Sequence, residues 1–243
     1  MTEPSPAERE APGVGPWQES TVVEIRPETL VTSTFRLRLG EPMAYVPGQH
    51  VVLRLTAPDG YTASRSYSLA SAPDGGPEIE LTVERLADGE VSGFLHDEVI
   101  VGDQLEVRGP IGRWFVWQGD APALLVGGGS GVVPLMSMLR SARQRGRSDL
   151  LHLVVSTRTP ADLYYPTELP GPETTVLYTR EAPDGWPRLP GRIRAEDLPG
   201  STPEVPRVYV CGSAGFADAA TAVLQDVGVP ADRIRVERFG ATG

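Results

Sequence analysis

The sequence contains no lysine and no asparagine, and each absence excludes a kind of chemistry. All 22 basic residues are arginine, so no lysine is available for a Schiff base or for the phosphate site of a P-loop. Without asparagine there is no N-glycosylation site. The single cysteine, Cys211, excludes a disulfide within the chain and an iron–sulfur cluster held by this chain's cysteines alone. His50, His96 and His152 lie far apart in the sequence, so we predict no metal site.

Long apolar runs and basic blocks are also missing. No run is long enough to span a bilayer, and the N-terminus lacks the positive-then-apolar order of a signal peptide. The formal net charge is -10, which argues against a nucleic-acid partner or an anionic membrane surface. We therefore predict a cytoplasmic protein. The 243 residues, 40% of them hydrophobic, are enough for two cores, so two domains are expected.

The first half of the chain has the pattern of an antiparallel barrel. Residues 1–16 are rich in Pro, Glu and Ala, and we predict a disordered tail. From Trp17 onward, apolar and polar residues alternate in short runs separated by Pro-Gly and Asp-Gly turns, at residues 35–39, 51–55, 79–83 and 105–107. This predicts a six-stranded barrel domain over residues 17–118. One helix is expected over residues 92–99, with Ser92 as its N-cap.

The second half alternates strand and helix. Apolar runs lie at residues 123–126, 150–155, 175–177 and 208–210, and residues 234–239 form a closing strand. Helical spacing occurs around residues 135–145, 161–169 and 216–227. Such alternation predicts a Rossmann-like domain with a parallel sheet over residues 119–243.

A glycine-rich turn connects the first strand and helix of this second domain. Residues 127–131 read GGGSG, and Pro134 follows in a first helical turn, where its missing N–H is harmless. Glycines permit a close approach of ligand to backbone, and a helix N-terminus binds phosphate oxygens. An ordinary strand–turn–helix connection remains the alternative. The stretch matches neither the P-loop nor GxGxxG, because Pro134 stands where the last glycine would be.

A second informative stretch is RSYS at residues 65–68. On a strand, Arg65 and Tyr67 lie on one face, where a cation and an aromatic ring can share a flat, anionic ligand. A surface strand with a ladder of polar side chains is the alternative.

Together with other motifs these stretches resemble the ferredoxin–NADP reductase family of flavoproteins. The motifs are RSYS (65–68), GEVS (89–92), GPIGRWF (109–115), GGGSGVVP (127–134) and CGSAGF (211–216). The resemblance covers the chain from Trp17 onward. It implies a barrel that binds flavin and a second domain that binds a nicotinamide nucleotide. FAD is favoured, with FMN as the alternative.

The resemblance implies a role for each residue of the flavin half. Arg65 pairs with flavin phosphate, Tyr67 packs on the isoalloxazine ring, and Ser68 hydrogen-bonds near its N5 edge. Val83 and Arg85 line the flavin, and the N–H groups of Val91 and Ser92 hold its pyrophosphate. A guanidinium suits phosphate, and a phenol ring stacks on a flat heterocycle. The cofactor-binding residues predicted in this half are Arg65, Ser66, Tyr67, Ser68, Val83, Arg85, Gly89, Val91 and Ser92.

In the nucleotide half the glycine turn becomes the pyrophosphate site. Thr157 and Arg158 follow the second parallel strand, where an arginine accepts a ribose 2′-phosphate; Arg180 and Arg192 are further contacts. These arginines favour NADPH, although arginine also fills every basic surface position of a lysine-free chain, and Asp162 could support NADH. The cofactor-binding residues predicted in this half are Gly128, Gly129, Ser130, Gly131, Pro134, Thr157, Arg158, Arg180, Cys211, Gly212 and Phe239.

By resemblance, Cys211 lies beside the nicotinamide C4 and helps to aim the hydride, without a covalent intermediate. As a residue alone, a lone cysteine at a strand end is equally a small buried hydrophobe. Cys211, Ser68 and Glu237 are the predicted catalytic residues. Phe239 is a candidate to stack on the flavin, although an alternating closing strand is the alternative, and Phe216 is expected in the core.

The predicted reaction is hydride transfer from NADPH to FAD, followed by one-electron delivery to a separate ferredoxin, flavodoxin or oxygenase component. Arg36, Arg38, Arg54 and Arg85 could form a local docking patch for an acidic carrier. Two alternatives remain. A flavin reductase would release reduced flavin to an oxygenase, and a non-catalytic subunit would bind nucleotide without turnover.

Overall fold

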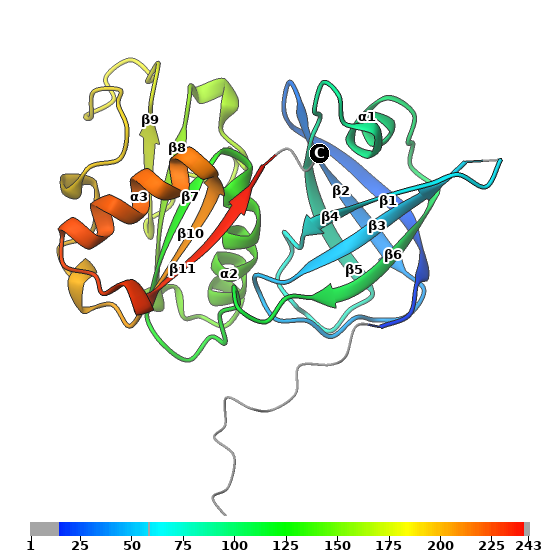
Figure 1. The fold of residues 1–243 in the computed structure, drawn as a ribbon, viewed down its shortest axis with the longest axis horizontal. Helices are drawn as coiled ribbons and strands as arrows, with labels where there is room; N and C mark the ends of the chain where they lie inside the picture. The colour runs from blue at the N-terminus through cyan, green and yellow to red at the C-terminus, as the bar shows by residue number, and fades with distance from the viewer. Residues whose placement is uncertain (1–14, 58, 241–243) are drawn as a thin grey trace, which may run out of the picture.

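The computed structural model describes residues 15–57 and 59–240, and its first half is a six-stranded antiparallel barrel (Figure 1). The strands are β1 (Gln18–Thr29), β2 (Thr32–Leu39), β3 (His50–Thr56), β4 (Thr62–Ser68), β5 (Glu78–Glu84) and β6 (Gln104–Ile111). They pair in the order β4-β3-β6-β1-β2-β5, and a bridge between Leu69 and Leu81 links the two ends of that order. The predicted barrel is confirmed. Residues 1–14 of the predicted tail lie outside the described residues.

Alternating apolar residues build the barrel. In β2, Phe35 and Leu37 are at most 2% exposed and lie in the barrel core, whereas the intervening Arg36 lies on the opposite face. Side chains of successive strand residues point to opposite faces, so one apolar residue in two is enough to fill the interior. The polar face of β2 and β5 is then free to meet another part of the protein.

Helix α1 (Glu90–Asp97) covers one end of the barrel, with Val91 and Leu95 buried in the barrel core. The helix was predicted, but the predicted N-cap is wrong, because Gly89 and not Ser92 is the cap. Ser92 lies inside the first turn, where its hydroxyl donates to the Gly89 carbonyl and accepts an N–H from the preceding loop. A serine can bind backbone groups from this position as well as from a cap.

The second half is a five-stranded parallel sheet. Its strands are β7 (Ala123–Gly128), β8 (Leu151–Thr157), β9 (Thr174–Tyr178), β10 (Arg207–Ser213) and β11 (Ile234–Phe239), in the order β11-β10-β7-β8-β9. Residues 123–127 of β7 are all buried, as expected for a strand covered on both faces. The predicted α/β architecture is confirmed.

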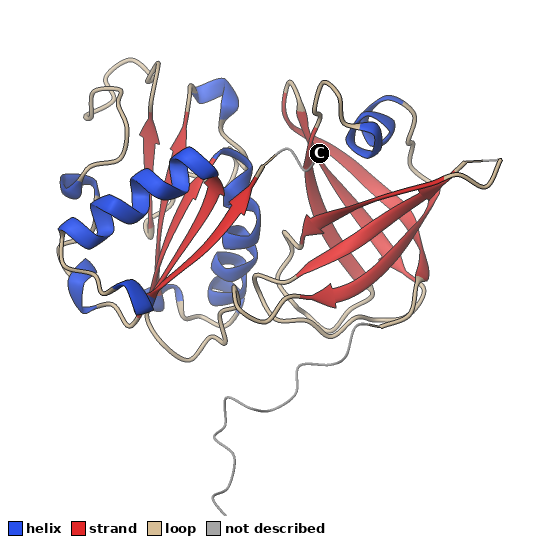
Figure 2. Ribbon diagram, viewed as in Figure 1, coloured by secondary structure: helices blue, strands red, loops and turns tan. Residues whose placement is uncertain are grey.

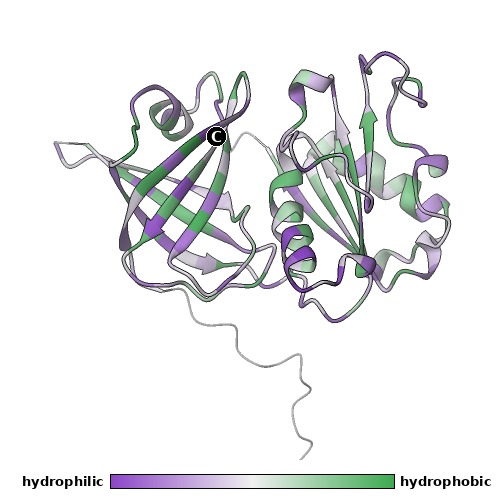
Figure 3. Ribbon diagram, turned by 180° about the vertical axis from the view of Figure 1, so that it is seen from behind, coloured by the Kyte–Doolittle hydropathy of each residue, from purple (hydrophilic) through white to green (hydrophobic). Residues whose placement is uncertain are grey.

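Two helices cover the two faces of the sheet (Figure 2). Helix α2 (Val132–Gln144) packs on the face toward the barrel, in a cluster that includes Leu135 and Phe115, and α3 (Ala214–Asp226) packs on the other face. In Figure 3 the parallel strands are mostly hydrophobic, whereas hydrophilic and hydrophobic residues alternate in the barrel. Among the described residues, no helix is both long and apolar enough to cross a membrane.

The predicted helix over residues 161–169 is wrong. A single 3-10 turn, Pro160–Asp162, is followed by an irregular loop. Tyr165 in this loop has a φ of 56°, and Pro166 follows it. A proline disfavours the helical conformation of the preceding residue, so the helical spacing of apolar residues cannot propagate into a helix. The loop turns toward the barrel instead.

Candidate active site

The nucleotide side of the site lies at the carboxyl ends of β7 and β10, which are neighbours in the sheet. β7 leads into the 3-10 turn Gly129–Gly131 and then into α2, with Pro134 buried in its first turn. Gly127 pairs in register with Cys211 of β10. The structure thus brings together the glycine turn and Cys211, at the strand ends where ligands bind in parallel α/β sheets.

Each glycine of the turn meets a different requirement. A Cβ on Gly131 would lie 2.1 Å from the carbonyl oxygen of Cys211, and a Cβ on Gly128 would lie 2.6 Å from the ring of Phe216. Gly129 has a φ of +54°, with nothing within 4 Å of its added Cβ position. The turn therefore packs tightly against β10 on one side, while the backbone of Gly129 stays open to a ligand on the other.

Cys211 and Glu237 lie side by side on β10 and β11, where they pair in register. Cys211 has no exposed surface, and burial, with the nearby Glu237 carboxylate, raises the pKa of its thiol well above the ordinary value. The thiol is thus neutral at physiological pH and unsuited to attack as a thiolate. Phe239 packs, partly buried, against the core cluster that contains Cys211, and Gly212 is buried beside it.

Glu237 is half-buried, and its Oε2 atom is buried without a hydrogen-bond partner among the described residues. Burial raises the pKa of Glu237 from 4.5 to about 7. A buried carboxylate without a donor favours the protonated form. Glu237 can therefore hold a proton at neutral pH, directly beside the thiol of Cys211.

This shift predicts a pH-dependent stability. Between pH 4.5 and 7 the unfolded chain ionises Glu237 while the folded chain keeps it protonated, so its contribution to stability is present at low pH and is lost as pH rises through about 7. We expect the free energy of unfolding of Glu237→Gln, relative to that of wild type, to increase by roughly 3 kcal/mol between pH 4.5 and 8. Urea unfolding of both proteins at several pH values measures this difference, and a difference independent of pH contradicts it.

The flavin side of the site is the β4 strand. Arg65 and Tyr67 pair with Leu53 and Val51 of β3, so they share one face, as predicted. Arg65 is exposed, whereas Tyr67 is half-buried and packs against the barrel core, where burial raises its pKa to about 12. A neutral phenol ring held in this way is suited to stacking.

The two serines of the motif, Ser66 and Ser68, lie on the opposite face of β4. Ser68 pairs in register with His50 of β3, and burial lowers the pKa of that histidine. His50 is therefore neutral at physiological pH. Sequence reasoning did not place His50 in the site.

The remaining flavin candidates follow β5. Val83 is 1% exposed and lies in the barrel core, so only its backbone could face a ligand, and its carbonyl already contacts the His96 imidazole at 2.9 Å. Arg85 makes a two-fold ion pair with Asp97 of α1, at 3.0 and 2.7 Å. The first backbone hydrogen bond of α1 runs from Gly93 to Gly89. The N–H groups of residues 90–92, which include the predicted Val91 and Ser92, precede it and have no acceptor within the helix.

Two of the predicted 2′-phosphate contacts lie together. Arg158 follows β8 and Arg180 follows β9, and the Arg158 carbonyl accepts the N–H groups of Arg180 and Glu181. Both side chains are exposed, and Thr157 is buried at the end of β8. Asp162, the feature that could support NADH, instead accepts hydrogen bonds from the N–H and hydroxyl of a neighbouring threonine.

The arginines of this lysine-free chain differ in their partners. Among the described residues, eleven form ion pairs with carboxylates: Arg26, Arg36, Arg38, Arg54, Arg85, Arg140, Arg143, Arg147, Arg188, Arg194 and Arg238. By contrast, Arg65, Arg158, Arg180 and Arg192 are exposed, and their guanidinium groups form no ion pair with a carboxylate of the described residues. The four positions predicted to meet phosphate are thus free to bind it, whereas Arg108 and Arg145, which are also exposed and without an ion pair among the described residues, donate to backbone carbonyls far along the chain.

The predicted docking patch is wrong. Its four arginines are all neutralised, Arg36 by Glu24 and Glu80, and the others by Glu78, Glu106 and Asp97. Arg54 on β3 is also separated in the sheet from Arg36 and Arg38 on β2, because β6 and β1 lie between these strands. No free basic surface results from these four arginines.

Comparison with known proteins identifies the family. Residues 20–116 match the oxidoreductase FAD-binding domain, and residues 125–222 match the oxidoreductase NAD-binding domain. The chain belongs to the ferredoxin–NADP reductase family of flavoproteins. The barrel and the parallel sheet are thus the FAD-binding and NAD(P)-binding parts of this reductase fold.

Similar proteins include oxygenase reductases. The chain is 31% identical to the reductase component of propane 2-monooxygenase from Rhodococcus jostii, over 90% of this chain and 62% of that protein. It is 33% identical to the glycine betaine monooxygenase reductase subunit of Chromohalobacter salexigens, over 90% and 63%. The FAD/NAD-binding domain of nitric oxide dioxygenase from Vibrio cholerae superposes with a TM-score of 0.82 at 26% identity, over 92% and 98%. The chain spans about three fifths of the curated relatives named here.

Some contacts near the site of this reductase-family chain were missed from the sequence. Phe216 was expected in the core, and it packs, partly buried, against the α3 cluster, but its ring also lies against Gly128 and Gly212. Its place four residues after Gly212 in the first turn of a helix could have indicated this. Arg140 and Tyr165 carried no recognisable motif, and only the fold reveals their contacts.

Proposed function

We propose that the chain is a reductase that takes a hydride from NADPH onto FAD and delivers electrons to a separate oxygenase component or carrier protein. The observation that carries this proposal is that Arg65, Arg158, Arg180 and Arg192 are exposed and have no carboxylate partner among the described residues, whereas eleven other arginines are ion-paired. Arg65 belongs to the flavin half, and the other three belong to the nucleotide half. Phosphate-bearing ligands in both halves explain this distribution.

The chain's own residues fit the two cofactors. Arg65 would hold a flavin phosphate, Tyr67 would stack on the ring system, and the N–H groups at the start of α1 would donate hydrogen bonds to the pyrophosphate. The turn around Gly129 would accept the pyrophosphate of the nucleotide. When bound, FAD supplies the conversion of a two-electron donor into one-electron steps.

The remaining predicted catalytic residues would act by orienting the reacting rings and by filling the space around them. Ser68 offers a hydroxyl at the end of β4, beside a neutral His50. Cys211 offers a neutral thiol that fills space at the strand end without reacting, and Glu237 holds a proton next to it. Such groups act by fixing the distance and electrostatics of the reacting rings.

The exposed Arg158 and Arg180 favour NADPH over NADH as the hydride donor, because a guanidinium can bind the ribose 2′-phosphate of NADPH. We expect Arg158→Ala to lower kcat/KM for NADPH by roughly 10- to 100-fold, the value of one charge-assisted hydrogen bond, and to leave kcat/KM for NADH nearly unchanged. Steady-state kinetics with both nucleotides measures the ratio. Arg147→Ala is the matched control, because Arg147 is an exposed arginine shortly before β8 that pairs with Asp149. An equal loss with both nucleotides contradicts the assignment.

One experiment tests the function as a whole. The purified protein is loaded with FAD, and NADPH or NADH is added without oxygen while flavin absorbance is followed. Bleaching by NADPH supports the proposal, faster bleaching by NADH reverses the choice of nucleotide, and no bleaching with either refutes the reductase function. Loading with FMN in parallel distinguishes the two flavins.

The oxygenase partner is supported by the two relatives named above, which are reductase components of monooxygenases. The neutralised arginines give no support to docking of an acidic carrier through Arg36, Arg38, Arg54 and Arg85. A flavin reductase is the second candidate, and weak flavin binding with free flavin acting as a substrate would distinguish it. A non-catalytic subunit would bind nucleotide without bleaching.

We place the domain boundary near residues 118–119 and propose a cytoplasmic location.

A further inference from the structure

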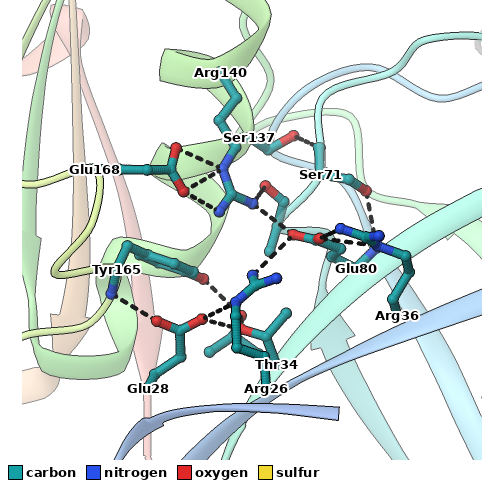
Figure 4. Close-up of polar contacts among 12 residues, drawn as sticks. Arg26, Glu28, Thr34, Arg36, Ser71, Glu80, Ser137, Arg140, Tyr165 and Glu168 are labelled. Atoms are coloured by element: carbon teal, nitrogen blue, oxygen red, sulfur yellow. Dashed lines mark hydrogen bonds and ion pairs between the residues drawn. The ribbon is translucent and has the colours of Figure 1, made fainter. Parts of the chain in front are cut away.

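Arg140 joins the two halves of the molecule (Figure 4). It lies on α2 of the nucleotide half, with its side chain 15% exposed. Its Nη1 donates to Oε2 of Glu80 at 2.8 Å and to the carbonyl of Ala70 at 2.9 Å, both in the barrel half. Its Nε and Nη2 donate to Glu168 in its own half. The Arg140 guanidinium therefore binds the barrel half through Nη1 and its own nucleotide half through Nε and Nη2.

Tyr165 makes a second connection beside it. Its hydroxyl donates to Oγ1 of Thr82 at 2.7 Å, and its backbone N–H donates to Oε2 of Glu28 at 3.0 Å, both in the barrel. The residue is 1% exposed, and the Arg140 guanidinium lies 4.8 Å from the centre of its ring. The positive φ of Tyr165 is thus held in place by contacts on three sides.

The barrel side of this contact is itself fixed. Glu80 on β5 also pairs with Arg36 at 3.0 Å and lies 3.7 Å from Arg26. Burial raises the pKa of Glu80, but Arg140 first, and then Arg36 and Arg26, hold that pKa below the ordinary value, so Glu80 is ionised in this cluster. A carboxylate shared by three guanidinium groups in a partly buried site is a rigid anchor, because losing any one of them leaves buried charge.

Arg140 connects α2 to β5, and each of these elements adjoins one of the proposed cofactor sites. α2 begins at the glycine turn, and a helix transmits displacement of one end to the other. β5 leads directly into the loop before Gly89 and α1. We propose that Arg140 and Tyr165 are positioning residues that fix the nucleotide turn relative to the flavin face. This inference rests on the proposed function, because it concerns the geometry in which a hydride passes.

The test compares Arg140→Met with Arg143→Met. Arg143 is the matched control, because it lies on the same helix but, among the residues that the structure describes, its ion pairs are with Glu168 and Glu173 of its own half. In stopped-flow reduction of the FAD-loaded protein, we expect Arg140→Met to lower the limiting rate at saturating NADPH at least 10-fold, with the apparent Kd for NADPH changed less than 2-fold. Arg140→Lys, which keeps the charge, should recover part of the rate.

Hydrogen exchange provides a readout without turnover. In the absence of nucleotide, Arg140→Met should speed exchange in β5 and in residues 163–169, whereas Arg143→Met should leave β5 unchanged. Tyr165→Phe, which removes one hydroxyl, is the milder variant if Arg140→Met does not fold, and it should speed exchange in β5 to a smaller degree.

The outcomes separate the two proposals. If NADPH does not reduce the wild-type protein, the proposed function fails, and exchange alone reports whether Arg140 connects the halves. If wild type is reduced but Arg140→Met keeps the wild-type limiting rate, the positioning role is refuted. The same conclusion follows if Arg143→Met loses as much rate, or if exchange in β5 does not change.

Discussion

Gly131→Ala is expected to destabilise the protein by about 3 kcal/mol, which lowers Tm by roughly 10 °C for a chain of this size. The added Cβ would lie 2.1 Å from the Cys211 oxygen and 2.5 Å from the Gly212 nitrogen. Both are backbone atoms in the sheet, so no side-chain rotation can relieve the clash. The turn or the end of β10 must move, and binding of NADPH should weaken together with stability. Thermal unfolding and nucleotide titration measure the two effects.

Gly215→Ala is the control for this substitution. Gly215 lies in the first turn of α3, and its added Cβ would meet nothing within 4 Å. Alanine at such a helical position should be neutral or stabilise by up to about 1 kcal/mol. If Gly131→Ala proves as harmless as Gly215→Ala, the tight packing between the glycine turn and β10 is not a feature of the protein in solution.

Arg65→Ala is expected to raise the Kd for FAD by roughly 10- to 100-fold while leaving the unfolding free energy of the flavin-free protein nearly unchanged. The guanidinium is exposed, and within the described part of the chain its one hydrogen bond runs to the neighbouring Ser64 carbonyl at 2.8 Å. Its removal therefore disturbs little of the fold. Fluorescence titration with FAD and urea unfolding of the flavin-free protein measure the two quantities.

Arg38→Ala tests whether any exposed barrel arginine has this effect. Arg38 is also exposed, but it pairs with Glu78 at 2.8 Å. We expect its loss to leave the Kd for FAD unchanged and to alter stability by less than about 1 kcal/mol, as for other surface ion pairs. Equal losses of FAD affinity in both variants would remove Arg65 from the phosphate site.

Much of the fold could be predicted because its signals are local. Alternation in β2 and β5 and the apolar run of β7 follow from burial on one or two faces. The same alternation that predicted β5 also places Val83 inside the barrel, so its proposed flavin contact conflicted with the strand pattern from the start. The resemblance to a family supplied a function for Val83 that its own position restricts to the backbone.

The errors arose where a distant partner decides the conformation. The helical spacing around residues 161–169 gives no sign that Tyr165 must reach Thr82 and Glu28 on another sheet. The sequence does not show which carboxylate an arginine will pair with. Arg54 and Arg158 therefore look alike in sequence, although Arg54 pairs with Glu106 and Arg158 is exposed. Ion pairs between distant residues depend on the assembled fold, which pattern reasoning does not supply.

The complete burial of Cys211 has a practical consequence for labelling. The thiol has no exposed surface, its pKa is raised, and it is the single cysteine of the chain. Maleimides and other thiol reagents act on accessible thiolates, so the folded protein presents no reactive site of its own. A cysteine introduced at any exposed position therefore becomes a unique attachment point for a dye or a spin label, with the native residue left in place.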